Sequence, residues 1–145
     1  MRHGAAPMSD RLLLDTCAAI WITTESDLAS KATAAIDESF QDGQSVSVSL
    51  ITAWEFGLLV ARGRVASTVT PRNWFRALVG EAGLVVADLS AEILIDSSFL
   101  PGEPPSDPAD RMIIATARAQ DMTIVTRDRA ILHYADAGHV RALLC

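Results

Sequence analysis

The sequence lacks the features that mark several classes of protein. Its 145 residues include only 2 cysteines, too few for the disulfide framework of a small secreted domain. No uninterrupted apolar run approaches the roughly 18 residues that a membrane-spanning helix requires. Asp15 interrupts the first apolar stretch too early for a signal peptide. These absences predict a protein of the reducing cytoplasm that has no part in a membrane.

Positive charge is also scarce. The chain has 12 Lys and Arg against 18 Asp and Glu, which gives a formal net charge of −6, and Lys31 is its single lysine. This balance argues against binding long nucleic acid through bulk charge, but it leaves room for a local acidic site that works through metal ions. Apolar residues make up 50% of the chain and charged residues 21%, a composition typical of a folded domain and not of a disordered chain.

Short apolar runs alternate with longer segments of helical periodicity. We expect residues 1–9 to be a disordered leader, with Met8 as an alternative start, and residues 10–145 to form a single domain. Strands are predicted at 11–14, 45–49, 84–87, 122–126 and 140–144, and helices at 27–40, 51–61, 71–81, 91–100, 107–119 and 129–134. This order predicts a three-layer α/β/α sandwich with a mostly parallel central sheet, because right-handed crossovers place helices on both faces.

Four acidic residues fall where such a topology gathers side chains, since ligand sites in parallel sheets lie at the carboxyl ends of the strands. Asp15 directly follows the first strand, and Asp128 follows Thr126 at the end of a later strand. Glu55 is the only ionisable residue within the apolar helix that leaves the second strand. Asp110 lies in the first turn of a helix whose N-terminus returns to the same edge.

These acids also have local interpretations. Asp107 is suited to cap a helix, and Asp110 is favourable near the positive end of that helix. Asp128 is suited to cap the helix that follows it, and Glu55 to lie on an exposed helix face. Taken together, however, like charges at one edge repel each other, and a hard divalent cation relieves that repulsion. Ligation by oxygen alone points to Mg²⁺ or Mn²⁺.

Four stretches of the chain resemble, in order, the sequence blocks of the PIN-domain ribonucleases. They are LLLDT at 12–16, SVSLITAWE at 47–55, DPADRMIIATA at 107–117 and TIVTRD at 123–128. The resemblance extends over nearly the whole chain from Arg11 onward. The length is similar to that of the VapC-type toxins of bacterial toxin–antitoxin pairs.

The resemblance implies a metal-dependent endoribonuclease that hydrolyses RNA phosphodiester bonds with Mg²⁺ or Mn²⁺. The acidic residues of its site would be Asp15, Glu55, Asp110 and Asp128, supported by the hydroxyls of Thr16 and Thr126 and by Asp107 just outside them. In this scheme Asp15 and Asp110 are direct metal ligands. Glu55 is a ligand or a base that orients water, and Asp128 is a ligand through water or for a second metal.

The resemblance also implies partners. A toxin that cuts RNA requires a cognate antitoxin, which often inserts a segment toward the acidic groove, and these proteins are usually homodimers. Cationic guides for the RNA phosphates are expected among Arg62, Arg64, Arg72 and Arg76, although solvated helix faces or contacts to an acidic partner explain them equally well.

Two further residue types carry weaker signals. Cys17 is interpreted as a small core residue, because no histidine or second cysteine lies at ligand spacing. Trp21, Trp54 and Trp74 are interpreted as core or interface residues. Trp21 and Trp54 lie close enough to the expected site to stack on a base.

There are three alternatives to the ribonuclease function. A phosphohydrolase of small phosphate esters with Asp15 as nucleophile normally has a second Asp two residues later, where this chain has Cys17. A phospho-accepting receiver domain needs a lysine near the late strands, and Lys31 is far from them in the sequence. A catalytically silent PIN-like binding scaffold is the third possibility, and the retained acids count against it.

Overall fold

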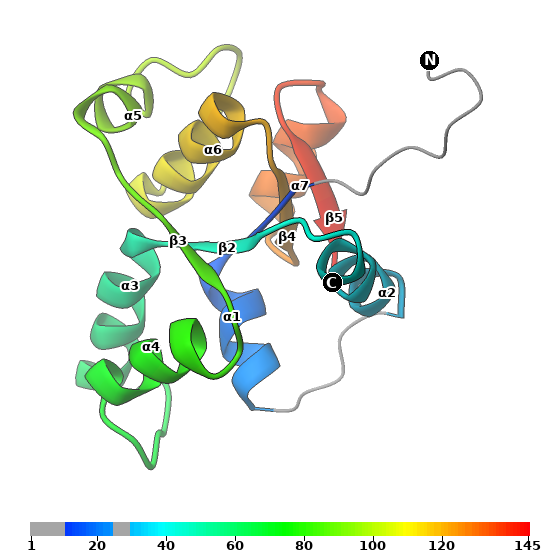
Figure 1. Cartoon of the computed structure of the whole chain (residues 1–145). Coiled ribbons are helices and arrows are strands. Elements are labelled where there is room, and N and C mark those ends of the chain that lie inside the picture. Colours follow the sequence, from blue (N-terminus) through cyan, green and yellow to red (C-terminus); the bar gives the residue numbers. More distant parts are fainter. Residues whose placement is uncertain (1–10, 25–29) are drawn as a thin grey trace.

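Five short strands form one all-parallel sheet at the centre of the protein (Figure 1). The computed structural model describes residues 11–24 and 30–145, so the expected leader and the expected helix start at Asp27 lie outside the described residues. The strands are β1 (Leu12–Leu14), β2 (Val46–Ser49), β3 (Val85–Ala87), β4 (Thr123–Thr126) and β5 (Arg141–Leu144), in the spatial order β3-β2-β1-β4-β5. The predicted parallel sheet is confirmed.

Seven helices flank the sheet in the part of the chain that the structure describes (Figure 1). They are α1 (Thr16–Thr23), α2 (Ser30–Gln41), α3 (Leu50–Ala61), α4 (Pro71–Gly80), α5 (Ala91–Asp96), α6 (Pro108–Gln120) and α7 (Arg129–Asp136). Within residues 11–24 and 30–145, no helix is both long and apolar enough to cross a membrane.

Two elements differ from the sequence prediction. The sequence did not indicate α1, because its residues are mostly apolar and show no one-sided periodicity. Helix α5 ends at Asp96 instead of reaching residue 100, and Ser97 caps its C-terminus with its N–H on the Ile93 and Ile95 carbonyls. Phe99 follows, with 80% exposure the most exposed large apolar side chain among the residues that the structure describes.

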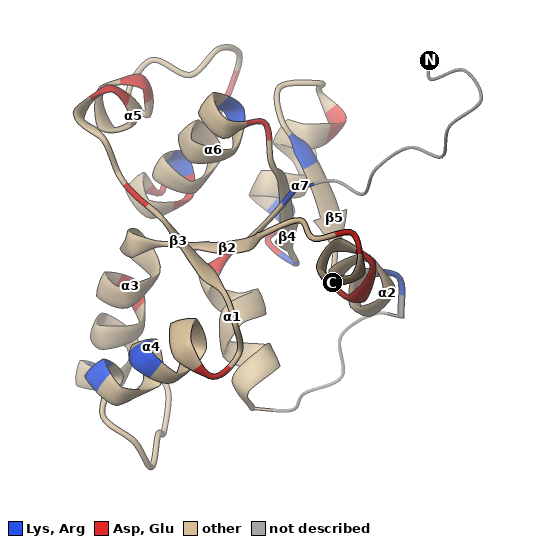
Figure 2. Ribbon diagram, viewed as in Figure 1, with Lys and Arg blue, Asp and Glu red and all other residues tan. Residues whose placement is uncertain are grey.

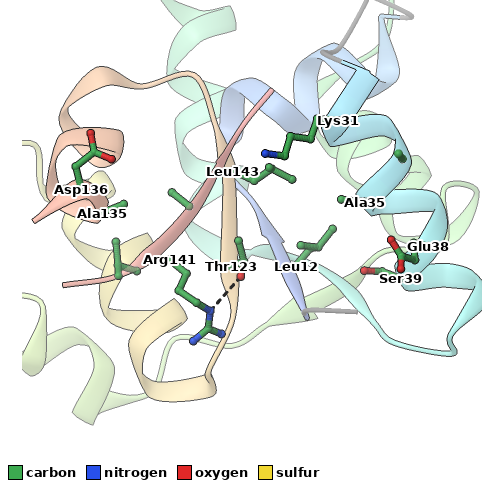
Figure 3. Close-up of a pocket in the computed structure, with 13 residues that line it drawn as sticks. Leu12, Lys31, Ala35, Glu38, Ser39, Thr123, Ala135, Asp136, Arg141 and Leu143 are labelled. Carbon is green, nitrogen blue, oxygen red and sulfur yellow. Dashed lines mark hydrogen bonds between the residues drawn. The ribbon is translucent and has the colours of Figure 1, made fainter. Parts of the chain in front are cut away.

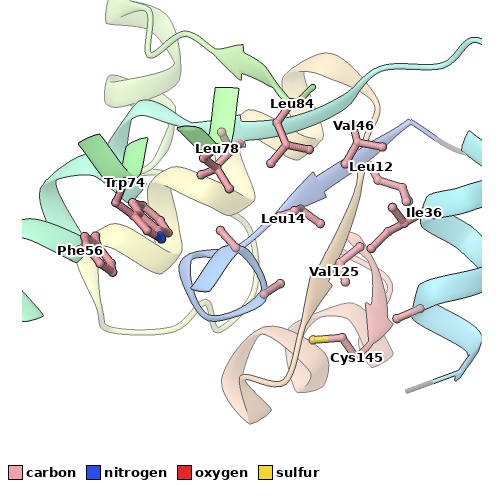
Figure 4. Close-up of a cluster of buried hydrophobic side chains, with 14 residues drawn as sticks. Leu12, Leu14, Ile36, Val46, Phe56, Trp74, Leu78, Leu84, Val125 and Cys145 are labelled. Atoms are coloured by element: carbon pink, nitrogen blue, oxygen red, sulfur yellow. The ribbon is translucent and has the colours of Figure 1, made fainter. Parts of the chain in front are cut away.

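Side chains of the central strand β1 alternate between the two faces of the sheet, as the pleat requires. Leu12 and Leu14 belong to the core on the face that α1, α2 and α4 cover, where Trp74 and Leu78 also pack (Figure 4). Leu13 points to the opposite core, which α6 and α7 cover. All three leucines of β1 are buried, which anchors the strand between two apolar layers.

Trp74 joins helix α4 to this core through two contacts. Its indole stacks on the ring of Phe56 with centroids 3.8 Å apart, and its Nε1–H donates to the Thr23 hydroxyl at 2.9 Å. The side chain is only 6% exposed. Helices α1, α3 and α4 therefore meet at one buried tryptophan.

Trp74→Ala should lower the free energy of unfolding by about 3–5 kcal/mol, because it leaves a cavity in the core and removes the indole hydrogen bond to Thr23. Trp54→Ala is the matched control, since that side chain is 56% exposed, and it should cost less than about 1 kcal/mol. Urea unfolding followed by circular dichroism measures both values. Equal losses for the two variants would contradict the assigned core.

Candidate active site

The carboxyl edge of the sheet has a topological switch point between β1 and β4. From β1 the sheet extends through β2 and β3 on one side and through β4 and β5 on the other, so the chain reverses its order at this point. Such a switch point is where parallel α/β proteins bind ligands. Leu14 pairs with Val125, and the Asp15 N–H donates to the Val125 carbonyl at 3.1 Å. The acid that follows β1 is thereby fixed beside the end of β4.

Asp15 is held by hydrogen bonds to both carboxylate oxygens. Oδ1 accepts from the Ala18 N–H at 2.8 Å, which caps α1, and Oδ2 accepts from the Thr126 hydroxyl. The side chain is 5% exposed. Burial raises the pKa of Asp15, the two hydrogen bonds oppose that rise, and the charge of Asp128 adds to it.

Thr126 links two of the predicted acids. Its hydroxyl donates to Asp15 and accepts from the Asp128 N–H at 2.9 Å. Oδ1 of Asp128 in turn accepts from the Ala130 and Ile131 N–H groups at 2.8 and 3.1 Å. Asp128 therefore has both of its predicted features: it caps α7 and lies beside Asp15 at the edge.

Glu55 lies on α3, and a threonine at the start of α1 holds its side chain in place. The Thr16 hydroxyl donates to Glu55 Oε1 at 2.5 Å and lies 3.0 Å from the Thr52 hydroxyl. Burial raises the pKa of Glu55, the Thr16 hydrogen bond lowers it, and the charges of Asp107, Asp15 and Asp128 raise it further. Thr52 was not predicted from the sequence as a residue of this site. Its spacing of three residues before Glu55, on the same helix face, was the available signal.

Asp107 and Asp110 share the first turn of α6. Oδ1 of Asp107 accepts from the Ala109 N–H at 2.7 Å and the Asp110 N–H at 3.2 Å, which confirms its predicted cap. Within the described residues, the Asp110 carboxylate accepts no hydrogen bond. Burial and then the charges of the neighbouring acids raise its pKa to about 7. The contributing acids, in decreasing order, are Asp128, Asp107, Glu55 and Asp15.

These interactions make the four predicted acids electrostatic neighbours at one edge of the sheet. In the side-chain positions that the structure describes, no three His, Cys, Asp or Glu groups approach closely enough to hold a metal ion together. The donor set nevertheless suits a hard cation, because it consists of carboxylate oxygens whose mutual repulsion and burial disfavour their own charges. Mg²⁺ and Mn²⁺ fit that chemistry.

The interpretation of Cys17 as a core residue is wrong, because the structure exposes it. The buried face of α1 carries Thr16, Ala18 and Ala19, and residue 17 points away from that face. Partial desolvation, followed by the charges of nearby acids, raises the pKa of its thiol to about 11. A protonated thiol is a poor nucleophile, so Cys17 supplies no thiolate chemistry to the site.

The three tryptophans occupy different environments. Trp74 is buried in the core, whereas Trp54 is more than half exposed. The ring of Trp21 is covered by the Arg127 guanidinium, whose Cζ lies 3.5 Å from the ring centroid, and Arg127 Nε also donates to the Cys145 carbonyl at 2.6 Å. Among the three, Trp54 alone offers a free ring close to the acids.

One cavity lies away from the four candidate acids. It has a volume of about 810 Å³ between α2 and β5 and is lined at its base by Leu12 and Thr123, which begin β1 and β4 (Figure 3). Arg141 donates to the Thr123 hydroxyl at 3.3 Å within it. This cavity therefore opens at the amino edge of the sheet, opposite the candidate active site.

Comparison with known proteins identifies the class. The family model described as PIN domain matches residues 12–137, and the chain belongs to the PIN-domain family. Ribonuclease VapC22 of Mycobacterium tuberculosis is 28% identical over 123 residues, 83% of this chain and 88% of the relative.

Solved structures share the fold. VapBC2 from Rickettsia felis, bound to a DNA fragment from its promoter, matches with a TM-score of 0.66 at 16% identity over 92% of this chain and 98% of that chain. FitAcB from Neisseria gonorrhoeae matches with a TM-score of 0.58 at 23% identity over 91% and 96%. The resemblance seen in the four sequence blocks is confirmed.

Removing the charge of Asp110 should stabilise the protein at alkaline pH. The pKa of about 7 in the folded chain exceeds the ordinary value of 3.8, so the folded state binds this proton more tightly than the unfolded state does. The resulting stabilisation is complete below the ordinary value and is lost as the pH rises through about 7. Asp110→Asn should therefore raise the free energy of unfolding by about 1 kcal/mol near pH 8, after allowance for solvent screening.

Urea unfolding in EDTA at about pH 4 and pH 8 measures this effect. The gain over the parent chain should be larger at the higher pH. Asp37→Asn is the control, because Asp37 is exposed on α2, and it should change stability equally little at both values. A gain from Asp110→Asn that does not grow with pH would contradict a raised pKa of Asp110 in the folded chain.

Proposed function

We propose that this chain is a metal-dependent endoribonuclease and the toxin of a type II toxin–antitoxin pair. Membership of the PIN-domain family and the similarity to a VapC ribonuclease support the reaction class. The observation that carries the proposal is the arrangement of four acids from separate segments at the switch point. Thr126 links Asp15 to Asp128 there, and burial together with the charges of the other acids raises the pKa of Asp110 to about 7. Acids gathered in this way are typical of catalytic sites.

Each acid has a definite part in the proposed reaction. A bound Mg²⁺ or Mn²⁺ supplies a water of lowered pKa and neutralises charge on the phosphate. Asp15 and Asp110 would hold the cation directly. Asp15 is oriented for this by Thr126 and the Ala18 N–H, whereas Asp110 has both oxygens available.

Glu55 is either a further ligand or the group that orients the attacking water. The Thr16 hydroxyl donates to its Oε1, which leaves Oε2 for such a role. Asp128 binds through water or holds a second cation, while its Oδ1 is engaged by the first turn of α7. Asp107 is assigned a place outside the cation sphere, as the family resemblance implies, and its Oδ1 caps the first turn of α6.

The first test is cleavage of a mixed pool of end-labelled structured RNAs by the purified protein, freed of any antitoxin, in Mg²⁺, Mn²⁺ or EDTA. Cutting should require a divalent cation. Asp15→Asn and Glu55→Gln should each lower the rate by about 100-fold or more while the fold stays intact, because shape and hydrogen bonds are largely kept. Asp37→Asn is the matched exposed control and should cut normally.

Two outcomes would count against this function. Full metal-dependent cutting by Asp15→Asn or Glu55→Gln would remove that residue from the site. Failure of the folded parent chain to cut any RNA in the pool with either cation would favour a PIN-like scaffold that binds without catalysis.

A cognate antitoxin and a homodimeric state complete the proposal, with action in the cytoplasm. The VapBC2 and FitAcB structures among the neighbours support an antitoxin partner. For the homodimer, the candidate face is a group of exposed apolar side chains that are close together in the sequence, on and just after α5. It comprises Leu94, Ile95 and Phe99, which are 39%, 60% and 80% exposed.

Replacing Ile95 and Phe99 by serine together should convert the dimer to a monomer, because the two side chains provide most of the apolar area of this face. Sedimentation velocity measures the mass. Phe40→Ser, at a residue 44% exposed on α2, is the control and should leave the dimer intact. A dimer that survives the double substitution would place the contact elsewhere.

A further inference from the structure

A small cavity adjoins the acidic edge beside Glu55. It has a volume of about 260 Å³ and lies between α3 and the start of α6, with Trp54 and Glu55 on one wall and Asp107 on the other. Arg62 and Arg64 also line it, and Leu58 and Leu59 form an apolar part of the lining. We refer to this space as the Trp54 cleft. Its size is below that of a pocket for a drug-sized ligand and suits one flat group.

The arginines of the Trp54 cleft are available to a ligand. Both are exposed, and the only ion pair within residues 11–24 and 30–145 joins Arg141 to Asp121, so neither Arg62 nor Arg64 is neutralised by a carboxylate. Arg62 follows Glu55 by seven residues, two turns and about 10 Å along α3. A guanidinium at that distance matches a phosphate a few nucleotide steps from the acids, and its planar fork binds phosphate through two parallel hydrogen bonds.

Trp54 adds an aromatic surface to these charges. Its side chain is 56% exposed, although its neighbour in the sequence is the partly buried Glu55. The other two rings are covered: Trp74 stacks on Phe56, and Trp21 lies under the guanidinium of Arg127. A single exposed aromatic side chain is common on protein surfaces, but the Trp54 ring lines a cavity together with two arginines. Nucleobases stack on such rings without regard to sequence.

We propose that the Trp54 cleft binds a nucleotide next to the scissile phosphate of single-stranded RNA, with its base stacked on Trp54 and the neighbouring phosphates held by Arg62 and Arg64. This inference rests on the proposed ribonuclease function and adds a substrate-binding site to it. A single strand is the favoured occupant, because it presents unstacked bases and phosphates together, which is the combination that this cleft offers. An acidic segment of a partner protein is the competing occupant.

The sequence indicates Arg72 and Arg76 as candidate RNA guides as well, but we assign the guiding role to the cleft arginines alone and use Arg72 and Arg76 as the matched control. They are exposed on α4, where Figure 2 shows basic positions, and neither lines the Trp54 cleft. The double variants Arg62→Ala/Arg64→Ala and Arg72→Ala/Arg76→Ala remove the same charge from neighbouring parts of the protein. Any difference between them therefore reports local contact instead of net charge.

Binding is measured apart from cleavage, in EDTA and in the Asp15→Asn background. The probe is a fluorescein-labelled single-stranded RNA of random sequence, about 12 nucleotides long, followed by fluorescence anisotropy over a series of salt concentrations. Arg62→Ala/Arg64→Ala should weaken binding by about tenfold and reduce the slope of log K against log salt by about 1.4, as expected for two lost phosphate contacts on a single strand. Arg72→Ala/Arg76→Ala should change binding by less than about twofold and leave the slope unchanged.

Substitutions at Trp54 test the stacking. Trp54→Ala should weaken binding of the same probe by about fivefold or more, and Trp54→Phe should restore most of that loss because a ring remains. The exposed position makes both variants safe for folding, which thermal unfolding checks. Equal weakening by alanine and phenylalanine would overturn the stacking role.

The outcomes separate this proposal from the proposed function. If metal-dependent RNA cleavage occurs but the Arg62 and Arg64 variant binds RNA no worse than the Arg72 and Arg76 variant, the cleft proposal fails and the ribonuclease stands. If the cleft variants keep RNA binding but lose a copurified antitoxin, the cleft is a protein-docking site and the proposal is overturned. Binding losses confined to the cleft variants would support it even where the pool contains no cleavable RNA.

Discussion

The parallel pairing of β1 with both β2 and β4 is the constraint on which the candidate site depends. Asp15 is the residue at which β1 ends, and its N–H is bonded to the Val125 carbonyl of β4. The Thr126 hydroxyl then connects Asp15 to the N-terminus of α7 through Asp128. Because all strands run in one direction, α3 and α6 bring their own acids to the same end of the sheet.

The site has an electrostatic cost that the rest of the protein offsets. Burial and mutual repulsion raise the pKa values of Asp15, Glu55 and Asp110, so each carboxylate is less stable as an anion here than in water. Two apolar cores, one on each face of the sheet, provide the opposing stabilisation. Hydroxyl donors hold Asp15 and Glu55 in place, whereas Asp110 remains the least compensated member, which suits a group proposed to bind a cation.

The two ends of the sheet therefore have different chemistry. The amino edge opens into a cavity of mixed charge between α2 and β5, and the carboxyl edge carries the coupled acids with the Trp54 cleft beside them. An acidic chain can meet an anionic polymer at such an edge only if cations or arginines mediate the contact. As proposed for this protein, the bound cation and the arginines Arg62 and Arg64 both mediate this contact.

The sequence by itself determined the alternation of strands and helices and put acids directly after strands, because periodicity, caps and strand ends are local properties of the chain. It did not indicate α1, whose apolar residues show no polar face, and it led to the wrong position for Cys17. The tertiary structure alone decided the strand order, and with it the contact of Asp15 with Thr126 across 111 positions of sequence. The tertiary structure also decided the environment of each tryptophan, because burial depends on packing between distant segments. Trp74 is in the core, Trp21 lies under a guanidinium, and Trp54 is exposed.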